Sequence, residues 1–551
     1  MWLAVIAVLG AAVRFWNLNW DEGAYYFHPD EWALNETVRK LGPDLNPRFF
    51  FYGSFPIYLY RFTAEALGWL TGLDWLARER LPLIGRAFSA LASTAMLPLV
   101  FAVGRRIWGM WAGLLAASLT AGAALLIQAA HFGTVDTAIT LAGVTLLWTS
   151  LRILAGAGRG WYIFSGVILG LAVATKLTAA SFMLLPLLSH LLMRKRNEAA
   201  LTSSPVRRHS SLLILLACAA LVTFLVAPYY LLAWDDFWRA IVEQTGELSG
   251  GYKLPYTWQF IGSTPYLFEL RNLVTWGLGL PPGIAALLGW AWMLAQAALK
   301  RPAPLLILTA WPTFYFAYIG TWEARFVRHT LPLVPFCCLF AAGGLVALCR
   351  LLDRRGRAVS WLARVAVAAV LIGALGWGLA VSSIYSQRDT RLAATDWIYK
   401  NVPAGSRLVV EDKNDLVPVP GFAPEGTQQD AYTFGVLKVT TPDTPAKMAD
   451  FAATLAGGDV LVIPNRRWSG VLPRLSAFPL TGRYYSLLLS GKLGYSQVAT
   501  FSNPPRLGPF AWPDDDAEET FQVFDHPTVR IFRNTGQLSS DALGALLAAP
   551  P

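Results

Sequence analysis

Charged side chains are scarce in this sequence. Only 15% of its 551 residues are Asp, Glu, Lys or Arg, whereas 55% are hydrophobic and the mean hydropathy is +0.44. Soluble globular proteins carry about one charged residue in four. The shortage of charge therefore excludes an ordinary soluble protein and predicts an integral membrane protein.

Cysteines and the motifs of common soluble enzymes are also rare or missing. The four cysteines lie within apolar runs and show neither CxxC nor Cys/His spacing, so we interpret them as small buried hydrophobic residues rather than metal ligands. The sequence contains no HExxH motif and no P-loop, and the glycine-rich stretch 156–160 lacks dinucleotide-binding spacing. These absences leave the membrane part as the place to look for function.

Eleven apolar runs approach the length of a membrane span. The first has no basic segment before it and no convincing cleavage site, so it is predicted to be a short first span rather than a signal peptide. The fifth and sixth runs could instead form one long interrupted helix. The runs cover residues 1–15, 84–103, 111–129, 138–154, 163–175, 178–193, 211–231, 276–298, 304–320, 330–349 and 365–384.

Basic residues gather in alternate loops between these runs. Residues 385–551 contain 15 Lys/Arg and 17 Asp/Glu, so the net charge of +12 in residues 1–384 belongs to the membrane part. Loop charge explains this excess better than a nucleic-acid-binding face. The positive-inside rule then places the amino terminus in the cytoplasm and the carboxyl-terminal part outside the plasma membrane.

The chain is predicted to have two domains. Residues 1–384 form an α-helical transmembrane domain of about eleven helices, in which residues 16–83 make a first extracytoplasmic loop with interfacial helices. Residues 385–551 form a soluble α/β domain with a helix at 392–400 and strands at 407–411, 459–464 and 529–533. The acidic run 514–519 could bind a cation, but a solvated loop is the simpler interpretation.

Two acidic motifs fall on the predicted outer face. The first is His28-Pro29-Asp30-Glu31, where proline followed by acids also fits an ordinary helix start. The second is the stretch from His131 to Asp136, whose carboxylate could equally be a helix N-cap. Both carboxylates are nonetheless predicted to lie on one side of the membrane.

Cations are predicted to lie on the same face. Lys176 stands alone at the outer end of a helix, where a charge is costly unless it has a function or reaches the interface. Arg325, Arg328 and His329 occupy an outer loop, where ordinary headgroup contact is the simpler alternative. Acids beside cations at bilayer depth suit transfer of a sugar from a lipid phosphate, because the leaving phosphate needs positive charge and the acceptor hydroxyl needs a base.

The order of these motifs resembles the GT-C membrane glycosyltransferases, in particular the family of protein O-mannosyltransferases and lipid A aminoarabinose transferases. The resemblance covers about residues 10–350. It rests on Arg14-Phe15-Trp16-Asn17-Leu18, Pro29-Asp30-Glu31, Arg86-Ala87-Phe88-Ser89, residues 131–136, Gly170-Leu171-Ala172 to Thr175-Lys176, and Arg328-His329-Thr330-Leu331-Pro332. It implies eleven or more helices and a periplasmic carboxyl-terminal domain.

The same resemblance assigns roles to residues. The family's catalytic first-loop acid maps onto Asp30 and its second outer-loop acid onto Asp136. Where the aminoarabinose transferases have Phe-Glu-Lys-Pro, this chain reads Tyr52-Gly53-Ser54-Phe55-Pro56, a departure that leaves the acceptor and any divalent metal ion open.

The resulting hypothesis is an inverting glycosyltransferase that uses a polyprenyl-phosphate-sugar donor and a lipid, glycan or protein hydroxyl as acceptor. Catalytic roles fall to Asp30, Asp136 and Glu31, and substrate binding to Lys176, Arg328, Arg325, His329, His28 and His131. The alternative is a transporter or flippase of a lipid-linked or small polar substrate. Ionisable residues near the midplane and paired repeats would favour that alternative, whereas here such residues cluster at one face.

Overall fold

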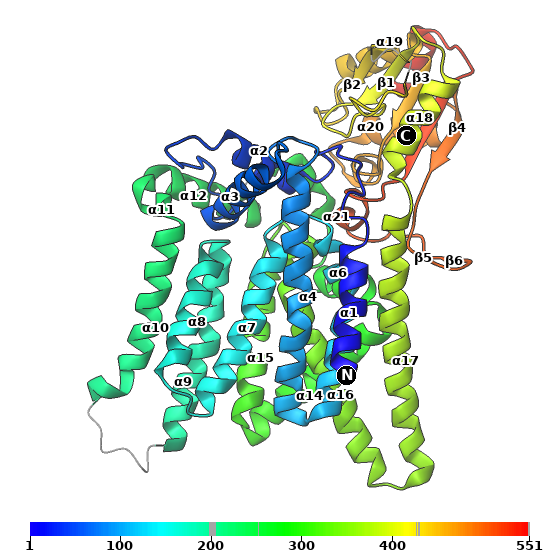
Figure 1. Ribbon diagram of the computed structural model, residues 1–551. Helices are drawn as coiled ribbons and strands as arrows, with labels where there is room; N and C mark the ends of the chain where they lie inside the picture. Colours follow the sequence, from blue (N-terminus) through cyan, green and yellow to red (C-terminus); the bar gives the residue numbers. More distant parts are fainter. Residues whose placement is uncertain (198–204, 252, 426, 428–429, 549–551) are drawn as a thin grey trace.

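The computed structural model describes residues 1–197, 205–251, 253–425, 427 and 430–548. Long helices run side by side through its lower part, and each of the eleven predicted apolar runs is helical over most of its length (Figure 1). The helices are α1 (Trp2–Phe15), α4 (Leu81–Trp108), α5 (Met110–Ala121), α6 (Ala124–Ala130), α7 (Asp136–Leu154), α8 (Arg159–Val173), α9 (Leu184–Asn197), α10 (Pro205–Val226), α14 (Leu280–Lys300), α15 (Ala303–Ile319), α16 (Val334–Asp353) and α17 (Arg357–Ser382).

The predicted count of eleven spans is not confirmed. Among the described residues, six helices are long and apolar enough to cross a bilayer, and the bent pair α5–α6 would make a seventh. Helices α1, α8 and α15 and the segment Leu177–Met193 are apolar but shorter, and a span needs about 20 residues. The chain is thus a multi-pass membrane protein in which four predicted spans are shorter than expected.

The fifth and sixth runs are two helices, not one interrupted helix. Helix α8 ends at Val173, a 3₁₀ turn covers Leu177–Met183, and α9 follows. The first loop, residues 16–83, contacts the segment between α8 and the 3₁₀ turn, because Gly53 N–H donates to the carbonyl of Thr175 at 2.9 Å. A β-carbon on Gly53 would lie 1.8 Å from the Ala174 oxygen, so only glycine allows this approach. Lys176 is thereby held at the outer end of the helices.

Arg14 is fully buried where the bent pair breaks. Helices α5 and α6 meet at 54°, which leaves backbone carbonyls unpaired in an apolar setting. The guanidinium of Arg14 donates to the carbonyls of Thr120 at 2.9 Å and Ala121 at 3.0 Å, and to the hydroxyl of Ser93 at 2.7 Å. This charge within the bundle therefore satisfies the broken helix and does not mark a substrate path.

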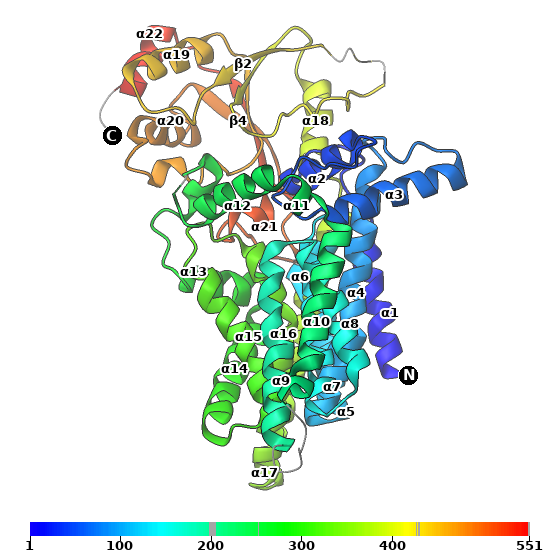
Figure 2. The same cartoon turned by 90° about the vertical axis from the view of Figure 1, so that its left-hand side faces the viewer.

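Shorter helices lie across one end of the bundle. Helices α2 (Pro29–Lys40) and α3 (Ser54–Thr71) come from the first loop. Helices α11 (Tyr229–Leu232), α12 (Trp234–Leu248) and α13 (Leu267–Asn272) come from residues 229–272, which we call the second outer segment (Figures 1 and 2). Helix α3 leaves Trp69 85% exposed, as expected for an amphipathic helix at a membrane surface.

The carboxyl-terminal domain stands above the same end of the bundle, opposite the loops that join α14 to α15 and α16 to α17 (Figure 1). Its five-stranded sheet has the order β2-β1-β3-β7-β4, with β1 parallel to β2 and β3, and β7 antiparallel to β3 and β4. The strands are β1 (Arg407–Glu411), β2 (Thr433–Leu437), β3 (Val460–Ile463), β4 (Tyr495–Phe501) and β7 (Val529–Asn534), with a separate hairpin of β5 (Arg506–Leu507) and β6 (Phe510–Ala511).

The three predicted strands and the predicted helix of this domain are confirmed. Strands β1, β3 and β7 and helix α18 (Thr390–Asn401) match them within two residues. Alternate strand residues face opposite sides: Leu461 and Phe532 pack in one core, whereas Val460 and Ile531 pack in the other, with α18. The first core includes residues of α19 (Pro445–Ala456), α20 (Pro479–Leu489) and α22 (Ser540–Ala548).

Candidate active site

The start of α2 carries Asp30. His28 caps this helix, because its Nδ1 accepts the Glu31 N–H at 3.4 Å, and Pro29 occupies the first turn. The helix-start interpretation is therefore correct for His28 and Pro29. Asp30 also makes a contact outside its own helix. Its carboxylate is 21% exposed and forms an ion pair with Arg328, which comes from the segment before α16.

The second predicted acid also meets a predicted cation. Asp136 begins α7, and its Oδ1 lies 2.9 Å from Nζ of Lys176. The ammonium of Lys176 lies 5.7 Å from the ring centre of Tyr52, which covers it from the first loop. Four candidates from three distant parts of the chain thus form two ion pairs, each of one proposed acid and one proposed phosphate ligand.

Asp30 and Arg328 of the first pair and Lys176 of the second border a cavity of about 320 Å³ at the end of the bundle that carries the carboxyl-terminal domain. Asp30, Lys176, Arg328 and His329 line it, and Nδ1 of His329 has no hydrogen-bond partner among the described residues. A smaller cavity next to it, of about 30 Å³, is lined by His28 and Asp136. Arg328 borders both cavities, so Asp30 and Asp136 line neighbouring cavities that have one cation in common.

Glu31 points away from this space. Its carboxylate accepts two hydrogen bonds of 2.8 Å from the guanidinium of Arg86 and one from the Gly133 N–H. Arg86 also binds both oxygens of Asp21, at 2.8 and 2.7 Å, and all three side chains are only 1% exposed. The predicted catalytic role of Glu31 has no support in this geometry, which makes it part of a buried cluster that holds α2 and the first loop on α4.

Two of the predicted substrate ligands likewise lie outside the cavities. Arg325 is 4% exposed and has Glu269 at 3.5 Å and the Ser263 hydroxyl at 2.9 Å, so it fixes the outer loop. His131 is fully buried, its ring stacks on Tyr385 at 3.5 Å, and each ring nitrogen lies 2.8 Å from a backbone carbonyl. Direct substrate contact by these two side chains is not supported.

The cavity also has walls that were not predicted from the sequence. Glu247 and Tyr256 come from the second outer segment, where they hydrogen-bond to each other and burial raises the pKa of Glu247. Other unpredicted lining residues come from the first loop, from α12 and from the carboxyl-terminal domain: Phe49, Phe51, Tyr52, Gln244, Arg467, Glu519, Thr520 and Phe524. The amphipathic spacing of residues 234–248 was the only sequence signal for this wall.

The donor set does not fit a divalent metal ion. Asp30 and Asp136 each pair with a cation, and within the described ranges no three His, Cys, Asp or Glu side chains converge on one point. Metal sites for Mg²⁺ or Mn²⁺ need several oxygen ligands around one position.

The acidic run of the carboxyl-terminal domain forms part of the site wall. The expected solvated loop is wrong for Asp514, Glu518 and Glu519, which are 2%, 2% and 5% exposed, whereas Asp515 and Asp516 are exposed. Helix α21 (Glu519–Gln522) begins at the end of this run and lies between the sheet and the bundle helices (Figure 1). The soluble domain therefore closes the cavity and is not a separate module above it.

A buried histidine anchors this segment. Both ring nitrogens of His526 lie 2.5 Å from carboxylates, those of Asp525 and Asp514. Asp525 in turn accepts the hydroxyl proton of Tyr385 at 2.6 Å and an N–H of Gln128 at 3.1 Å, which ties the segment to α6 and to the end of α17. The two carboxylates raise the pKa of His526 to about 10, so it is an imidazolium at neutral pH.

The charge on His526 predicts that the thermal stability of the folded protein depends on pH. The folded protein holds the proton up to about pH 10, whereas unfolded histidine loses it near its usual pKa of about 6.5. The charged ring therefore stabilises the folded state fully below about pH 6.5, and this stabilisation is lost as pH rises through about 10. His526→Gln should lower the thermal unfolding temperature most at pH 6.5 and least at pH 10. A difference from wild type that stays constant across this range would contradict the assignment.

The helical architecture is similar to that of solved GT-C membrane glycosyltransferases, in agreement with the resemblance inferred from the motifs. More particularly, residues 81–227 match the sequence profile of the dolichyl-phosphate-mannose-protein mannosyltransferase family. No curated protein matches the chain by sequence.

Two solved structures share the fold. ArnT from Cupriavidus metallidurans, bound to undecaprenyl phosphate, is 15% identical, covers 100% of this chain and 99% of its own, and has a TM-score of 0.50. The oligosaccharyltransferase of Archaeoglobus fulgidus is 12% identical, covers 93% of this chain and 74% of its own, and also has a TM-score of 0.50. At these identities the likeness concerns the fold.

Proposed function

We propose that the protein transfers a hexose-type sugar from a polyprenyl-phosphate donor to a hydroxyl acceptor on the extracytoplasmic face. The observation that carries this proposal is the convergence of Asp30, Arg328 and Lys176 on one cavity beneath the carboxyl-terminal domain. The family profile and the undecaprenyl phosphate bound by the similar ArnT structure support a lipid-phosphate donor. The basic loops at the opposite end of the bundle support a cytoplasmic amino terminus.

The proposed reaction uses one base and two cations. The Asp30 carboxylate takes the proton of the acceptor hydroxyl, whose oxygen attacks the anomeric carbon from the face opposite the phosphate. The bond from the anomeric carbon to the phosphate oxygen breaks, its electron pair goes to that oxygen, and polyprenyl phosphate leaves. Arg328 and Lys176 neutralise the departing charge. Attack opposite the leaving group inverts the configuration at the anomeric carbon.

The ion pairs connect donor binding to activation of the base. Arg328 is paired with Asp30, and Lys176 is paired with Asp136. A phosphate that binds both cations competes with these carboxylates, so Asp30 is released to accept a proton when the donor is in place. The order of events is then donor first and acceptor second.

An apolar groove offers a path for the polyprenyl chain. It has a volume of about 570 Å³ and lies between α3 and α10, where Phe55, Tyr58 and Phe62 face Leu225 and Val226. Phe55 follows Tyr52 of the cavity by three residues, so the groove begins beside the phosphate ligands. A chain of isoprene units in this groove would keep its phosphate at the cavity.

Arg328 is expected to control donor affinity. Because hydrogen bonds to charged groups contribute about 1.5–3 kcal/mol, Arg328→Gln should weaken binding of polyprenyl-phosphate-mannose by about 10- to 100-fold. Arg328→Lys should lose less donor affinity, because lysine keeps the positive charge although it cannot form bidentate hydrogen bonds with phosphate. Binding is measured by titration of the full chain in nanodiscs, with Arg80→Gln, outside the cavity, as the control variant.

Mass spectrometry of the lipid that copurifies with the protein tests the donor class directly, because its head group identifies the donor. Unchanged donor affinity in Arg328→Gln would contradict the role of Arg328 in donor binding. Uptake of a solute into vesicles without any glycosylated product would contradict the transferase and favour a transporter or flippase.

A further inference from the structure

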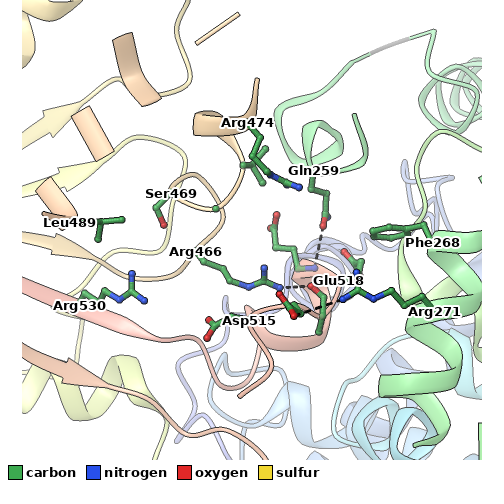
Figure 3. A pocket seen from close by; sticks show the side chains of 15 residues that line it. Gln259, Phe268, Arg271, Arg466, Ser469, Arg474, Leu489, Asp515, Glu518 and Arg530 are labelled. Atoms are coloured by element: carbon green, nitrogen blue, oxygen red, sulfur yellow. Dashed lines mark hydrogen bonds and ion pairs between the residues drawn. The ribbon is translucent and has the colours of Figure 1, made fainter. Parts of the chain in front are cut away.

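A second cavity, of about 580 Å³, lies between the carboxyl-terminal domain and α13. Four arginines border it. Figure 3 shows Arg271 entering from α13 on one side and Arg466 from the carboxyl-terminal domain on the other, with Arg474 and Arg530 on the domain's side. Guanidinium groups arranged on facing walls are suited to carboxylate or phosphate groups, which they bind through paired N–H donors.

Four acids, Asp515, Asp516, Glu518 and Glu519, also border this cavity. Glu519 forms a 2.7 Å ion pair with Arg467, and the Glu518 carboxylate accepts the Val327 N–H at 3.2 Å and the Thr520 N–H at 3.1 Å. Asp516 is 3.9 Å from Arg271. Two of the four acids thus pair with arginines, and none forms an ion pair with Arg474 or Arg530 among the described residues.

The arginines of the domain have spare donors. Arg466 donates to two neutral groups, the Ala517 carbonyl and the Gln522 side chain. Arg474 and Arg530 have no side-chain hydrogen bond or ion pair with any residue that the structure describes. The cavity thus presents two guanidinium groups on the domain's side whose N–H donors are unused.

The cavity shares a wall with the candidate active site. Glu519 borders both cavities, and the adjacent Arg466 and Arg467 border one cavity each. Gln259 joins the wall, because its side-chain oxygen accepts the Glu519 N–H at 3.2 Å. A molecule bound among the arginines would therefore lie beside the space where transfer is proposed.

We propose that this cavity binds an anionic saccharide, a sugar that carries a carboxylate or phosphate and belongs to the acceptor. The volume suits one or two sugar rings. Ser469 and Gln259 offer polar groups for hydroxyls, and the ring of Phe268 offers an apolar face for a sugar. The acceptor assignment rests on the proposed function, whereas binding of the anionic sugar does not require transfer.

The test is a calorimetric titration of the full chain in nanodiscs of neutral lipid, without donor. The probes are trigalacturonate, mannose 6-phosphate and the neutral mannotriose. Wild type is expected to bind at least one anionic probe and to bind mannotriose more weakly. The double variant Arg474→Gln/Arg530→Gln should raise the dissociation constant of the anionic probe about tenfold or more.

The matched control removes two positive charges elsewhere in the same domain. Lys492→Gln/Arg533→Gln lies outside the cavity and should bind as wild type does. Loss of binding in this control as well, equal binding of mannotriose, or no binding of either anionic probe would overturn the proposal. So would unchanged binding in Arg474→Gln/Arg530→Gln.

Sugar transfer by Asp30 and binding of the anionic sugar can be tested independently. Asp30→Asn should bind the anionic probe like wild type, because Asp30 lies in the other cavity. Retained sugar transfer in that variant would refute the role of Asp30 and leave the binding result intact. The stronger anionic probe then tells whether carboxylate or phosphate is the recognised group.

Discussion

Asp30→Asn is expected to reduce sugar transfer by about 10²–10⁴-fold, the usual contribution of a general base. Asparagine keeps the size of the side chain and removes its ability to accept the hydroxyl proton. Because Asp30 pairs with Arg328, the variant also frees that cation. Donor affinity should therefore stay equal to that of wild type or increase.

The measurement is release of polyprenyl phosphate from a polyprenyl-phosphate sugar, with an envelope extract as the source of acceptors, beside titration of the donor. Asp44→Asn is the control, because Asp44 is an exposed acid of the same loop and its salt bridge is with Arg48. Near-normal turnover in Asp30→Asn would remove the base from the mechanism. A parallel loss of donor binding would assign Asp30 to binding rather than to proton transfer.

Replacement of Arg86 should have the largest effect on folding. Arg86→Gln leaves Asp21 and Glu31, both 1% exposed, without their shared cation. Breaking a buried ion pair in this way costs about 3–5 kcal/mol. The variant should unfold at a clearly lower temperature, followed by tryptophan fluorescence in nanodiscs, and its first loop should become sensitive to protease.

A triple variant tests whether the loss of stability comes from unpaired buried charge. Asp21→Asn/Glu31→Gln/Arg86→Gln removes all three charges and should recover much of the lost stability, because no uncompensated ion remains. If Arg86→Gln unfolds like wild type, the cluster does not hold the first loop. Full transfer activity in a stable Glu31→Gln variant would confirm that Glu31 positions α2 and takes no part in the reaction.

Neighbouring residues show why the site could be predicted only in part. Asp30 and Glu31 are adjacent on α2, and successive helical residues point about 100° apart, so one faces the cavity and the other Arg86. Arg325 and Arg328 differ in the same way, since the first pairs with buried Glu269 and the second with Asp30. Sequence spacing alone did not distinguish the members of these pairs.

The walls of the cavity depend on contacts between distant segments. Glu247 and Thr520 are separated by more than 250 residues, yet both border the cavity that holds Asp30. The acidic run of the carboxyl-terminal domain looked solvated because its burial comes from helices elsewhere in the chain. Such burial leaves no local signal in composition or periodicity.

By itself the sequence determined the features that depend on local physics. The scarcity of charge and the apolar runs predicted the helices, because backbone groups in a bilayer must be satisfied within each segment. Loop charge predicted which end of the bundle carries the outer motifs. Only the tertiary structure decided which of those residues meet, because pairing Asp30 with Arg328 and Asp136 with Lys176 depends on how separate helices pack. The same packing brought the soluble domain down onto the cavity that we propose as the transfer site.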